Sequence, residues 1–180
     1  MTDYVRNAWY MAAWAEEIPE GRFLARTLLD RKWLLWRERD GGWAMIEDRC
    51  PHRFVPLSRG TFHDGRIACG YHGLTFDGTG ACVHNPFGGE LPPTARVATW
   101  PLFEAHGGLW FWPGDPAKAD PALVPDMHWN DDPQWAGDGK LITVQCDYRL
   151  VVDNLMDLTH ETFVHGSSIG QRAVAEAPFV

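Results

Sequence analysis

The sequence predicts a mainly β domain, followed by a connector and the start of a second, α+β domain. Up to residue 112, short apolar and aromatic runs alternate with Asp and Gly turn residues, as in all-β domains. Residues 113–133 then contain five Pro and five Asp, which prevents a long helix. Beyond them the composition becomes helical. We therefore expect domains at 1–112 and 138–180, joined by a connector at 113–137.

A β-hairpin is the clearest element of the first domain. Residues 32–38 and 43–47 are apolar and rich in aromatic side chains, and an Asp-Gly-Gly turn at 40–42 separates them. A second turn signal, Asp-Gly-Thr-Gly, occupies 77–80. The remaining expected strands cover 66–69, 74–76, 81–83, 96–101 and 109–112.

Two short segments predict how the second domain begins. Residues 141–148 alternate between apolar and polar side chains, as a β-strand does. Residues 150–160 have helical composition, with Leu150, Leu155 and Leu158 spread around the expected helix. A strand followed by a helix is therefore expected here.

Length and cysteine content limit the class of protein. The chain of 180 residues can hold one full domain and part of a second. Its four Cys are too few for a disulfide scaffold, so we expect Cys82 and Cys146 to be buried thiols in a reducing cytosol. The apolar run at 8–15 is too short for a signal peptide or a transmembrane helix. A cytoplasmic location is therefore expected.

Charge is distributed unevenly along the chain. Residues 1–66 carry eleven Lys and Arg against ten Asp and Glu, whereas residues 67–180 carry five against fourteen, for a net charge of −8. A solvated surface without a partner is the default interpretation. The alternative is a basic face for an acidic electron donor, and nothing supports nucleic-acid binding. The basic residues proposed for that face are Arg22, Arg26, Arg31, Lys32, Arg37, Arg39 and Arg49.

Two short strings pair one Cys with one His, namely Cys50-Pro-His52 and Cys69-Gly-Tyr-His72, with sixteen residues between His52 and Cys69. Two thiolates and two imidazoles in this order suit a [2Fe–2S] centre of the Rieske type, in which two His replace two Cys on one iron. By analogy, Cys50 and Cys69 would hold one iron and His52 and His72 the other. Glycines at 70 and 73 would let the backbone approach the cluster closely.

A structural zinc site is the main alternative for these four residues. Zinc sites usually open with two Cys two to four residues apart and close with two His. Here the order is Cys-His-Cys-His, and only one residue separates the first pair. The order therefore favours a two-iron cluster over zinc, and unrelated buried Cys and His are favoured still less.

A second group of candidate ligands, Asp153, Asn154, Asp157, His160 and His165, lies within thirteen residues. On a helix, Asp153, Asp157 and His160 would share a face. His165 would lie about 140° further round, so both His can bind one metal only if the helix bends or ends between them. Two His suit a mononuclear Fe(II) site, which uses two His and one carboxylate. The alternative is a solvated acidic helix face.

Asp157 is expected to act beside the metal rather than on it. It lies one turn from His160, where its carboxylate could hydrogen-bond the imidazole. We include Asp157 and Asn154 as candidate catalytic residues, and His160 and His165 as metal ligands.

Both groups together resemble the oxygenase components of Rieske ring-hydroxylating and demethylating systems, and most closely the vanillate and dicamba O-demethylase group. Respiratory Rieske proteins carry two further Cys that form a disulfide, and here Val55 and Tyr71 occupy those places. The further segments that match the demethylase group are residues 6–10, 82–86, 112–116, 119–121 and 152–157.

The resemblance implies a head-to-tail trimer that receives electrons from NADH through a reductase and a ferredoxin. It implies electron transfer from the cluster at His72 of one chain, through Asp157, to His160 and a mononuclear iron in the next. It also implies a helix-grip catalytic domain, of which only the first elements are present, and a third iron ligand, an Asp, beyond residue 180. We therefore expect an N-terminal fragment that binds the cluster but holds mononuclear iron weakly and is inactive alone.

The activity that the resemblance implies is O-demethylation of a methoxylated aromatic acid with O2 as co-substrate. Ring cis-dihydroxylation is an alternative within the same enzyme class. A stand-alone Rieske electron carrier is an alternative from another class, and residues 153–165 argue against it.

Overall fold

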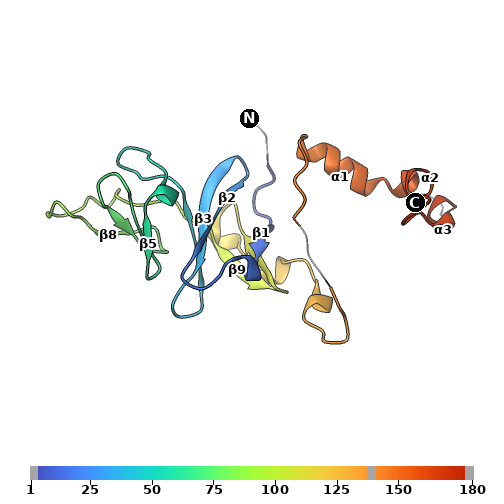
Figure 1. Ribbon diagram of the computed structural model, residues 1–180, viewed down its shortest axis with the longest axis horizontal. Helices are drawn as coiled ribbons and strands as arrows, with labels where there is room; N and C mark the ends of the chain where they lie inside the picture. The colour runs from blue at the N-terminus through green and yellow to red at the C-terminus, as the bar shows by residue number, and fades with distance from the viewer. Residues whose placement is uncertain (1–3, 138–140, 177–180) are drawn as a thin grey trace. The chain divides into compact units, whose positions relative to one another are not determined.

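The computed structural model describes residues 4–137 and 141–176, and its internal contacts divide the chain into two units, 1–137 and 138–180. The first unit is built from β-strands and short 3-10 helices, and the second from short helices (Figure 1). The mainly β character predicted for the first part is therefore confirmed.

The predicted hairpin forms two strands, β3 and β4, of a three-stranded antiparallel sheet ordered β2–β3–β4. The strand β3 is central, and its residues 33–36 are all fully buried. Successive side chains of a strand point to opposite faces, so Leu34 and Trp36 enter one apolar cluster while Trp33 and Leu35 enter the other. The strands are β2 (Phe23–Leu28), β3 (Arg31–Arg37) and β4 (Trp43–Glu47).

A four-stranded antiparallel sheet, ordered β5–β6–β7–β8, carries the second Cys-His string between two of its strands. Its buried residues Ile67 and Phe76 pack in the same cluster as Leu34, Trp36 and the two Cys of the strings. The strands are β5 (Thr61–His63), β6 (Arg66–Ala68), β7 (Thr75–Phe76) and β8 (Cys82–His84).

The third sheet, ordered β1–β10–β9, joins the start of the chain to residues a hundred positions later. Tyr10 pairs with Phe111, and a bulge interrupts the register between Met11 and Ala13. The strands are β1 (Tyr10–Trp14), β9 (Leu102–Ala105) and β10 (Gly108–Phe111).

The strand predicted at 96–101 is wrong. This segment forms only two isolated bridges, Arg96 to Ala81 and Thr99 to Ile46. It crosses from the β7–β8 region to the β4 edge and pairs one residue with each, so no continuous ladder can form.

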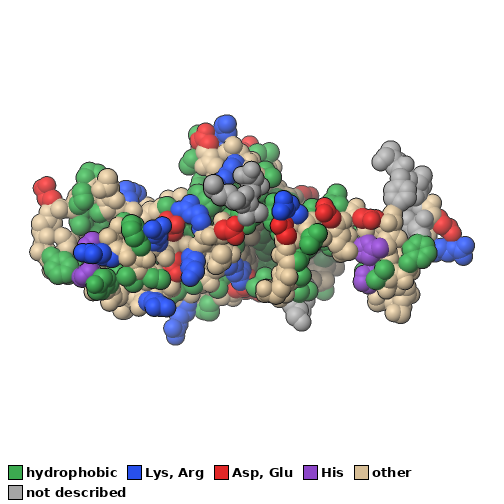
Figure 2. Space-filling model, turned by 90° about the horizontal axis from the view of Figure 1, so that it is seen from above, with side chains coloured by type: hydrophobic (Ala, Val, Ile, Leu, Met, Phe, Trp, Pro, Cys, Tyr) green, Lys and Arg blue, Asp and Glu red, His purple; other side chains and the backbone are tan. Residues whose placement is uncertain are grey.

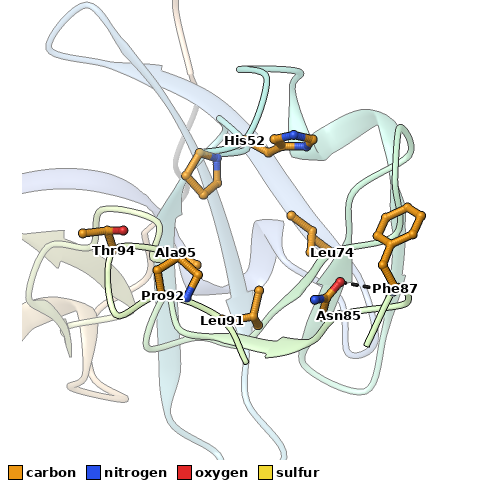
Figure 3. Close-up of a pocket in the computed structure, with 9 residues that line it drawn as sticks. His52, Leu74, Asn85, Phe87, Leu91, Pro92, Thr94 and Ala95 are labelled. Carbon is orange, nitrogen blue, oxygen red and sulfur yellow. Dashed lines mark hydrogen bonds between the residues drawn. The ribbon is translucent and has the colours of Figure 1, made fainter. Parts of the chain in front are cut away.

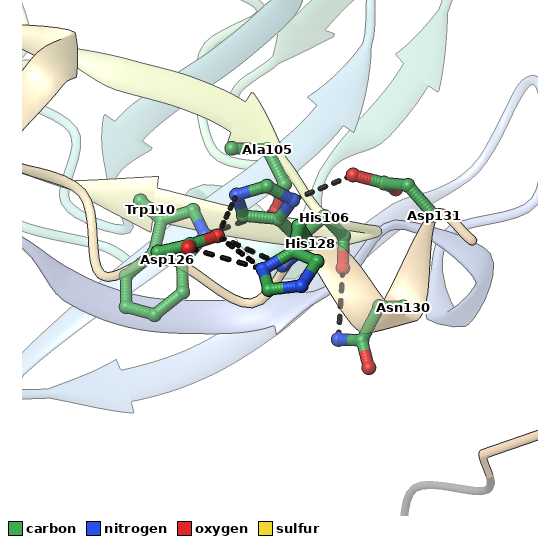
Figure 4. A network of polar contacts seen from close by, with 7 residues as sticks. All are labelled: Ala105, His106, Trp110, Asp126, His128, Asn130 and Asp131. Atoms are coloured by element: carbon green, nitrogen blue, oxygen red, sulfur yellow. Dashed lines mark hydrogen bonds and ion pairs between the residues drawn. The ribbon is translucent and has the colours of Figure 1, made fainter. Parts of the chain in front are cut away.

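The connector contacts residues that flank the strands of the third sheet. Asp115 and Asp120 cap 3-10 helices that begin with Pro, and Trp9 donates a hydrogen bond from Nε1 to the Asp120 carbonyl (2.8 Å). In Figure 4 the turn between β9 and β10 holds the connector through His106, whose Nδ1 lies 2.5 Å from Asp131. The connector helices are η3 (Pro116–Lys118), η4 (Pro121–Leu123) and η5 (His128–Asn130).

The strand predicted at 141–148 is also wrong. Residues 141–147 form no regular structure, and Asp147 instead caps α1 by accepting a hydrogen bond from the Arg149 amide (3.0 Å). A strand needs a neighbouring strand, and residues 141–176 supply none. The helices are α1 (Tyr148–Met156), η6 (Leu158–His160), α2 (Glu161–Val164) and α3 (Arg172–Ala175). Within the described residues, no helix combines the length and hydropathy needed to cross a bilayer.

Candidate metal centres

The first Cys-His string forms a tight loop that follows β4. The Cys50 amide donates to the Val55 carbonyl (2.9 Å), and the Phe54 amide donates back to the Cys50 carbonyl (2.9 Å). Phe54 has φ +59°, in the left-handed region that a bulky residue rarely adopts. The two backbone bonds therefore close the loop that carries His52.

The second string, between β6 and β7, repeats the same backbone bonds. The Cys69 amide donates to the Leu74 carbonyl (2.8 Å), and the Gly73 amide donates to the Cys69 carbonyl (2.9 Å). Gly73 has φ +74° and occupies the place that Phe54 takes in the first loop. The two loops have the same backbone hydrogen bonds but carry the His at different positions. His72 is the third residue after Cys69, whereas His52 is the second after Cys50.

The two sulfur atoms lie together in the core. Cys50 and Cys69 are only 2% and 4% exposed and belong to one apolar cluster. Burial raises the pKa of the Cys50 thiol and the adjacent Cys69 thiol raises that pKa further, while the His52 and Arg53 amides, which donate to the sulfur, oppose the shift. A metal cation at this point would hold both groups as thiolates.

The two imidazoles lie close together, with His52 exposed and His72 half-buried. The ring centroids of His52 and His72 are 4.9 Å apart. The Tyr71 ring packs on His72 at 3.9 Å, and Phe87 makes an edge contact at 6.1 Å. The donor set thus combines two buried thiols with one exposed and one half-buried imidazole.

The buried carboxylate of Asp48 links the two ends of the first loop by hydrogen bonds. Asp48 accepts hydrogen bonds from the Ser58 amide and hydroxyl, each 2.7 Å long. These bonds tie the end of β4 to the 3-10 helix η2 (Leu57–Arg59), which follows the loop. The sequence offered no signal for this role, since one Asp before a Cys has no distinctive spacing.

The arrangement fits a two-iron cluster better than zinc. A Rieske centre asks for two thiolates on one iron and two imidazoles on the other, and the chain supplies two such pairs. In the described residues, no three His, Cys, Asp or Glu side chains converge on one metal ion. Cys50, Cys69, His52 and His72 are therefore the candidate ligands for such a cluster.

An apolar pocket of about 350 Å³ opens beside the first loop (Figure 3). His52 forms part of its wall, next to Leu74. The segment that follows β8 supplies most of the remaining wall, including Phe87, Leu91 and Pro92. One imidazole thus borders a cavity without a charged lining residue.

The second candidate group differs from the expectation of one helix face. Helix α1 ends at Met156, and Asp157 is extended (φ −103°, ψ 92°). The His160 Nδ1 donates to the Asp157 carbonyl (2.6 Å), so the backbone, and not the predicted carboxylate, orients this imidazole. Because Nδ1 carries the proton, Nε2 of His160 is left as the metal-binding atom.

The Asp157 carboxylate bonds to Thr159 instead. Its Oδ1 accepts from the Thr159 amide (3.0 Å) and hydroxyl (2.5 Å). These bonds hold the pKa of the Asp157 carboxyl below its usual range, with a smaller contribution from His160. The carboxylate therefore stays ionised, with one oxygen engaged by Thr159.

The break in the helix brings the two His of this segment together. Their ring centroids are 5.6 Å apart, and His165 directly follows α2. The Asn154 amide nitrogen lies 3.4 Å from the His160 Nε2. His160, His165 and Asn154 are thus neighbours, while Asp153 is not brought onto them.

Other expectations have mixed outcomes. Cys146 is exposed, so the prediction that it is buried is wrong, and Cys82 is half-buried.

Four of the basic residues proposed for a donor face are engaged by acidic side chains. These pairs are Arg26–Glu17 (2.6 Å), Arg31–Glu47 (2.9 Å), Arg37–Glu104 (3.9 Å) and Arg39–Asp64.

Comparison with known families matches both halves of the chain. Residues 8–101 match the Rieske [2Fe–2S] domain, and residues 144–179 match the vanillate O-demethylase oxygenase C-terminal domain. The oxygenase component of dicamba O-demethylase from Stenotrophomonas maltophilia is 50% identical, over 90% of this chain and 48% of that protein. The vanillate O-demethylase oxygenase subunit from a Pseudomonas species is 45% identical, over 97% and 49%. The chain thus spans about half the length of these relatives.

Solved structures give the same result. Dicamba monooxygenase bound to 3,6-dichlorosalicylic acid superposes with a TM-score of 0.87 at 47% identity, over 96% of this chain and 51% of that one. Dicamba monooxygenase with non-haem iron and dicamba gives 0.81 at 48% identity, over 89% and 49%. The reduced oxygenase–ferredoxin complex of carbazole 1,9a-dioxygenase gives 0.69 at 30% identity, over 86% and 40%.

Proposed function

Because this chain belongs to the Rieske [2Fe–2S] family, we propose that it is part of the terminal oxygenase of a Rieske non-haem iron monooxygenase. The proposed reaction is O-demethylation of a methoxylated aromatic acid, with O2 as co-substrate and electrons from NADH through a reductase and ferredoxin. The observation that carries the proposal is a cluster site and a His pair in one chain whose relatives are O-demethylase oxygenase components.

The reaction balances as a monooxygenation. One oxygen atom of O2 enters a methyl C–H bond and the other leaves as water, using two electrons and two protons. The resulting hemiacetal collapses to a phenol and formaldehyde. When bound, the cluster would supply these electrons one at a time and the mononuclear iron would activate O2.

The chain's own residues divide this work. Cys50 and Cys69 would hold one iron of the cluster from the core, and the exposed His52 and half-buried His72 would hold the other. His160 and His165 would bind the mononuclear iron, with a carboxylate from elsewhere in the whole protein as third ligand. The Asn154 amide would stand beside the metal-binding Nε2 of His160.

Asp157 is proposed as the bridge between the two metals in a head-to-tail homotrimer. Thr159 engages only Oδ1 of its carboxylate, and Oδ2 accepts nothing from residues 4–137 or 141–176. Oδ2 could therefore accept a hydrogen bond from the His72 imidazole of a second copy. The exposed Phe87 and the pocket beside His52 give that copy an apolar surface to cover.

Formaldehyde release tests the proposal. The full-length oxygenase, with its reductase and ferredoxin, is given vanillate-like acids, and formaldehyde and the phenol are quantified against NADH and O2 consumed. Equimolar formaldehyde and phenol are expected. A cis-diol without formaldehyde would assign ring dihydroxylation instead, and no O2 uptake with any aromatic acid would assign an electron carrier.

A further inference from the structure

A cluster of two His and two Asp side chains ties the connector to the first unit, and it includes none of the candidate metal ligands (Figure 4). Its members are His106 in the β9–β10 turn, and Asp126, His128 and Asp131 in and around η5. Figure 2 shows His side chains at the end of the first unit where β5 and β8 lie, whereas β9 and β10 belong to a different sheet. The cluster is therefore separate from the Cys-His loops.

A tight turn places His106. Ala105 pairs with Gly108, so His106 and Gly107 alone connect β9 to β10, and their φ angles are +55° and +74°. Two residues with positive φ are typical of the type I′ hairpin turn, and His is one of the few side-chain-bearing types enriched in this region. The Trp110 indole donates to the Ala105 carbonyl (3.1 Å) at the base of the turn. The hairpin thus presents the His106 imidazole to the connector.

The His106 imidazole lies between two carboxylates of the connector. Its Nδ1 is 2.5 Å from the Asp131 Oδ2, and its Nε2 is 4.0 Å from the Asp126 Oδ1, which is ion-pair distance. The His106 side chain is only 23% exposed, so these charges are screened less than fully solvated ones. The Asn130 side-chain amide also donates to the His106 carbonyl (3.2 Å). Both sides of one imidazole therefore face the same short segment of the connector.

The protonation state of His106 decides how many of these carboxylates it can serve. A neutral imidazole carries one N–H, and the Asp131 carboxylate can only accept, so the neutral ring donates from Nδ1 and leaves a lone pair at Nε2 towards Asp126. The imidazolium carries an N–H on both sides and a positive charge between two negative ones. Imidazoles exchange this proton between about pH 5 and pH 8, a range in which Asp side chains are ionised. The full contact therefore needs a protonated ring.

The remaining charged groups near His106 act within the connector or within the β-sheets. The His128 amide and imidazole hold the pKa of the Asp126 carboxyl below its usual range. The His128 Nδ1 lies 3.0 Å from both oxygens of Asp126, but this contact joins two connector residues and does not reach the hairpin. Glu104, on β9, pairs with Arg37 (3.9 Å). His106 is therefore the titratable group whose charge links the hairpin to the connector.

We propose that His106 is the pH-sensitive part of a clasp that closes residues 126–131 onto the β9–β10 hairpin at mildly acidic pH and loosens them above neutral pH. Protonation and closure favour each other, because the closed clasp offers the imidazolium two carboxylates. Release would add up to about 20 Å of extended chain to the free part of the connector, at about 3.4 Å per residue. The clasp would thus set the length of free connector that precedes the second unit, whichever reaction the protein performs.

Amide hydrogen exchange of the cluster-loaded full-length protein tests the clasp. The reporter amides are those of Asn130 and Asp131, which bond within η5 (2.9 Å each). The internal standard is the Leu123 amide in η4, which donates to the Asp120 carbonyl (3.0 Å). Exchange of peptides from both helices is followed by mass spectrometry from about pH 5.5 to about pH 8.5. It is expressed as a protection factor relative to the intrinsic exchange rate at each pH.

Protection of the η5 amides is expected to fall about threefold to tenfold from the acidic to the alkaline end, while protection at Leu123 stays constant. His106→Asn removes the titrating ring and suits the positive φ of the turn, so it should abolish this pH dependence. Asp131→Asn, a change at an exposed side chain, should lower η5 protection mainly at the acidic end. Unchanged cluster absorbance verifies that each variant is folded.

His128→Asn is the matched control. It removes an imidazole that pairs with Asp126 inside the connector, so the pH dependence of η5 protection should persist. Constant η5 protection in the wild-type protein, or a fall of equal size at Leu123, would overturn the clasp. A pH dependence that survives His106→Asn, or one that is lost in His128→Asn, would do the same.

Discussion

The two candidate metal centres differ in how firmly the fold holds their ligands. The Cys of the cluster site are buried in the core, and four backbone hydrogen bonds close their loops. The His of the iron site lie on short helical segments, where no side chain among residues 148–165 is fully buried. The first site is thus prepared by packing before any metal binds. The second has two ligands oriented by local bonds, and metal binding must supply more of its order.

The largest effect is expected from removing a cluster ligand. Cys50→Ser or Cys69→Ser should abolish the cluster, because Ser is a weak ligand for iron and its hydroxyl would be buried without a partner. Acid-labile sulfide and the visible spectrum of the purified protein measure the loss. Cys146→Ser, at an exposed thiol, is the control and should retain a full cluster. Wild-type sulfide content in Cys69→Ser would remove that thiol from the ligand set.

Asp157→Asn should act on the link between the two sites. The cluster should remain loaded and reducible, while turnover falls by about 10-fold to 100-fold or more, because the amide cannot replace the charged acceptor. Stopped-flow reoxidation of the reduced cluster measures this link directly. Asp153→Asn, a neighbouring exposed carboxylate, should react at the wild-type rate. A normal reoxidation rate in Asp157→Asn would exclude the bridge.

A smaller effect is expected from the backbone of the second loop. Gly73→Ala places a Cβ at φ +74°, 2.9 Å from the Pro86 Cγ, and should lower the free energy of unfolding by about 1–2 kcal/mol or more. Urea denaturation measures the change. Gly88→Ala is the matched control, since it has φ +73° but no atom within 4 Å of the added Cβ. An equal loss of unfolding free energy in both variants would show that the backbone strain at positive φ accounts for the whole effect. Pro86 would then move aside for the added Cβ without a cost.

The smallest effect is expected in the second unit, at the cap of α1. Hydrogen bonds from Arg149 lower the pKa of Asp147 to about 2, from 3.8. Because the folded pKa is the lower one, the cap is fully present above pH 3.8 and is lost as the pH falls towards about 2. The Arg149 amide chemical shift, followed by NMR, should titrate in this window. Asp147→Asn keeps a capping oxygen and should remove the titration.

The meeting of the two Cys-His strings was largely predictable from sequence, because its signal is local. Two residue types at fixed short spacing define each loop, and the turn at 40–42 defines the hairpin beside it. The left-handed Phe54 and the Asp48–Ser58 bonds were not predictable. Both depend on where the chain goes after the loop.

The iron-site segment was predicted less well, for the same physical reason. The composition of 150–160 favours a helix throughout, yet Asp157 caps the following turn with its own side chain and ends α1 at Met156. That break brings His160 and His165 together. Residues 96–101 and 141–148 were likewise predicted as strands but form none. Whether a segment becomes a strand depends on a neighbouring strand to pair with, and the sequence pattern of the segment does not show whether one is present.

The central strand β3 has a consequence for cooperativity. Because residues 33–36 are buried on both sides, the cluster-side core and the β1–β10 core share one strand. Neither core can open while the other stays closed, so the β3 amides should exchange with solvent only by global unfolding of the first unit. Loss of the cluster should therefore accelerate hydrogen exchange at Trp33, whose side chain belongs to the other core, as much as at Trp36.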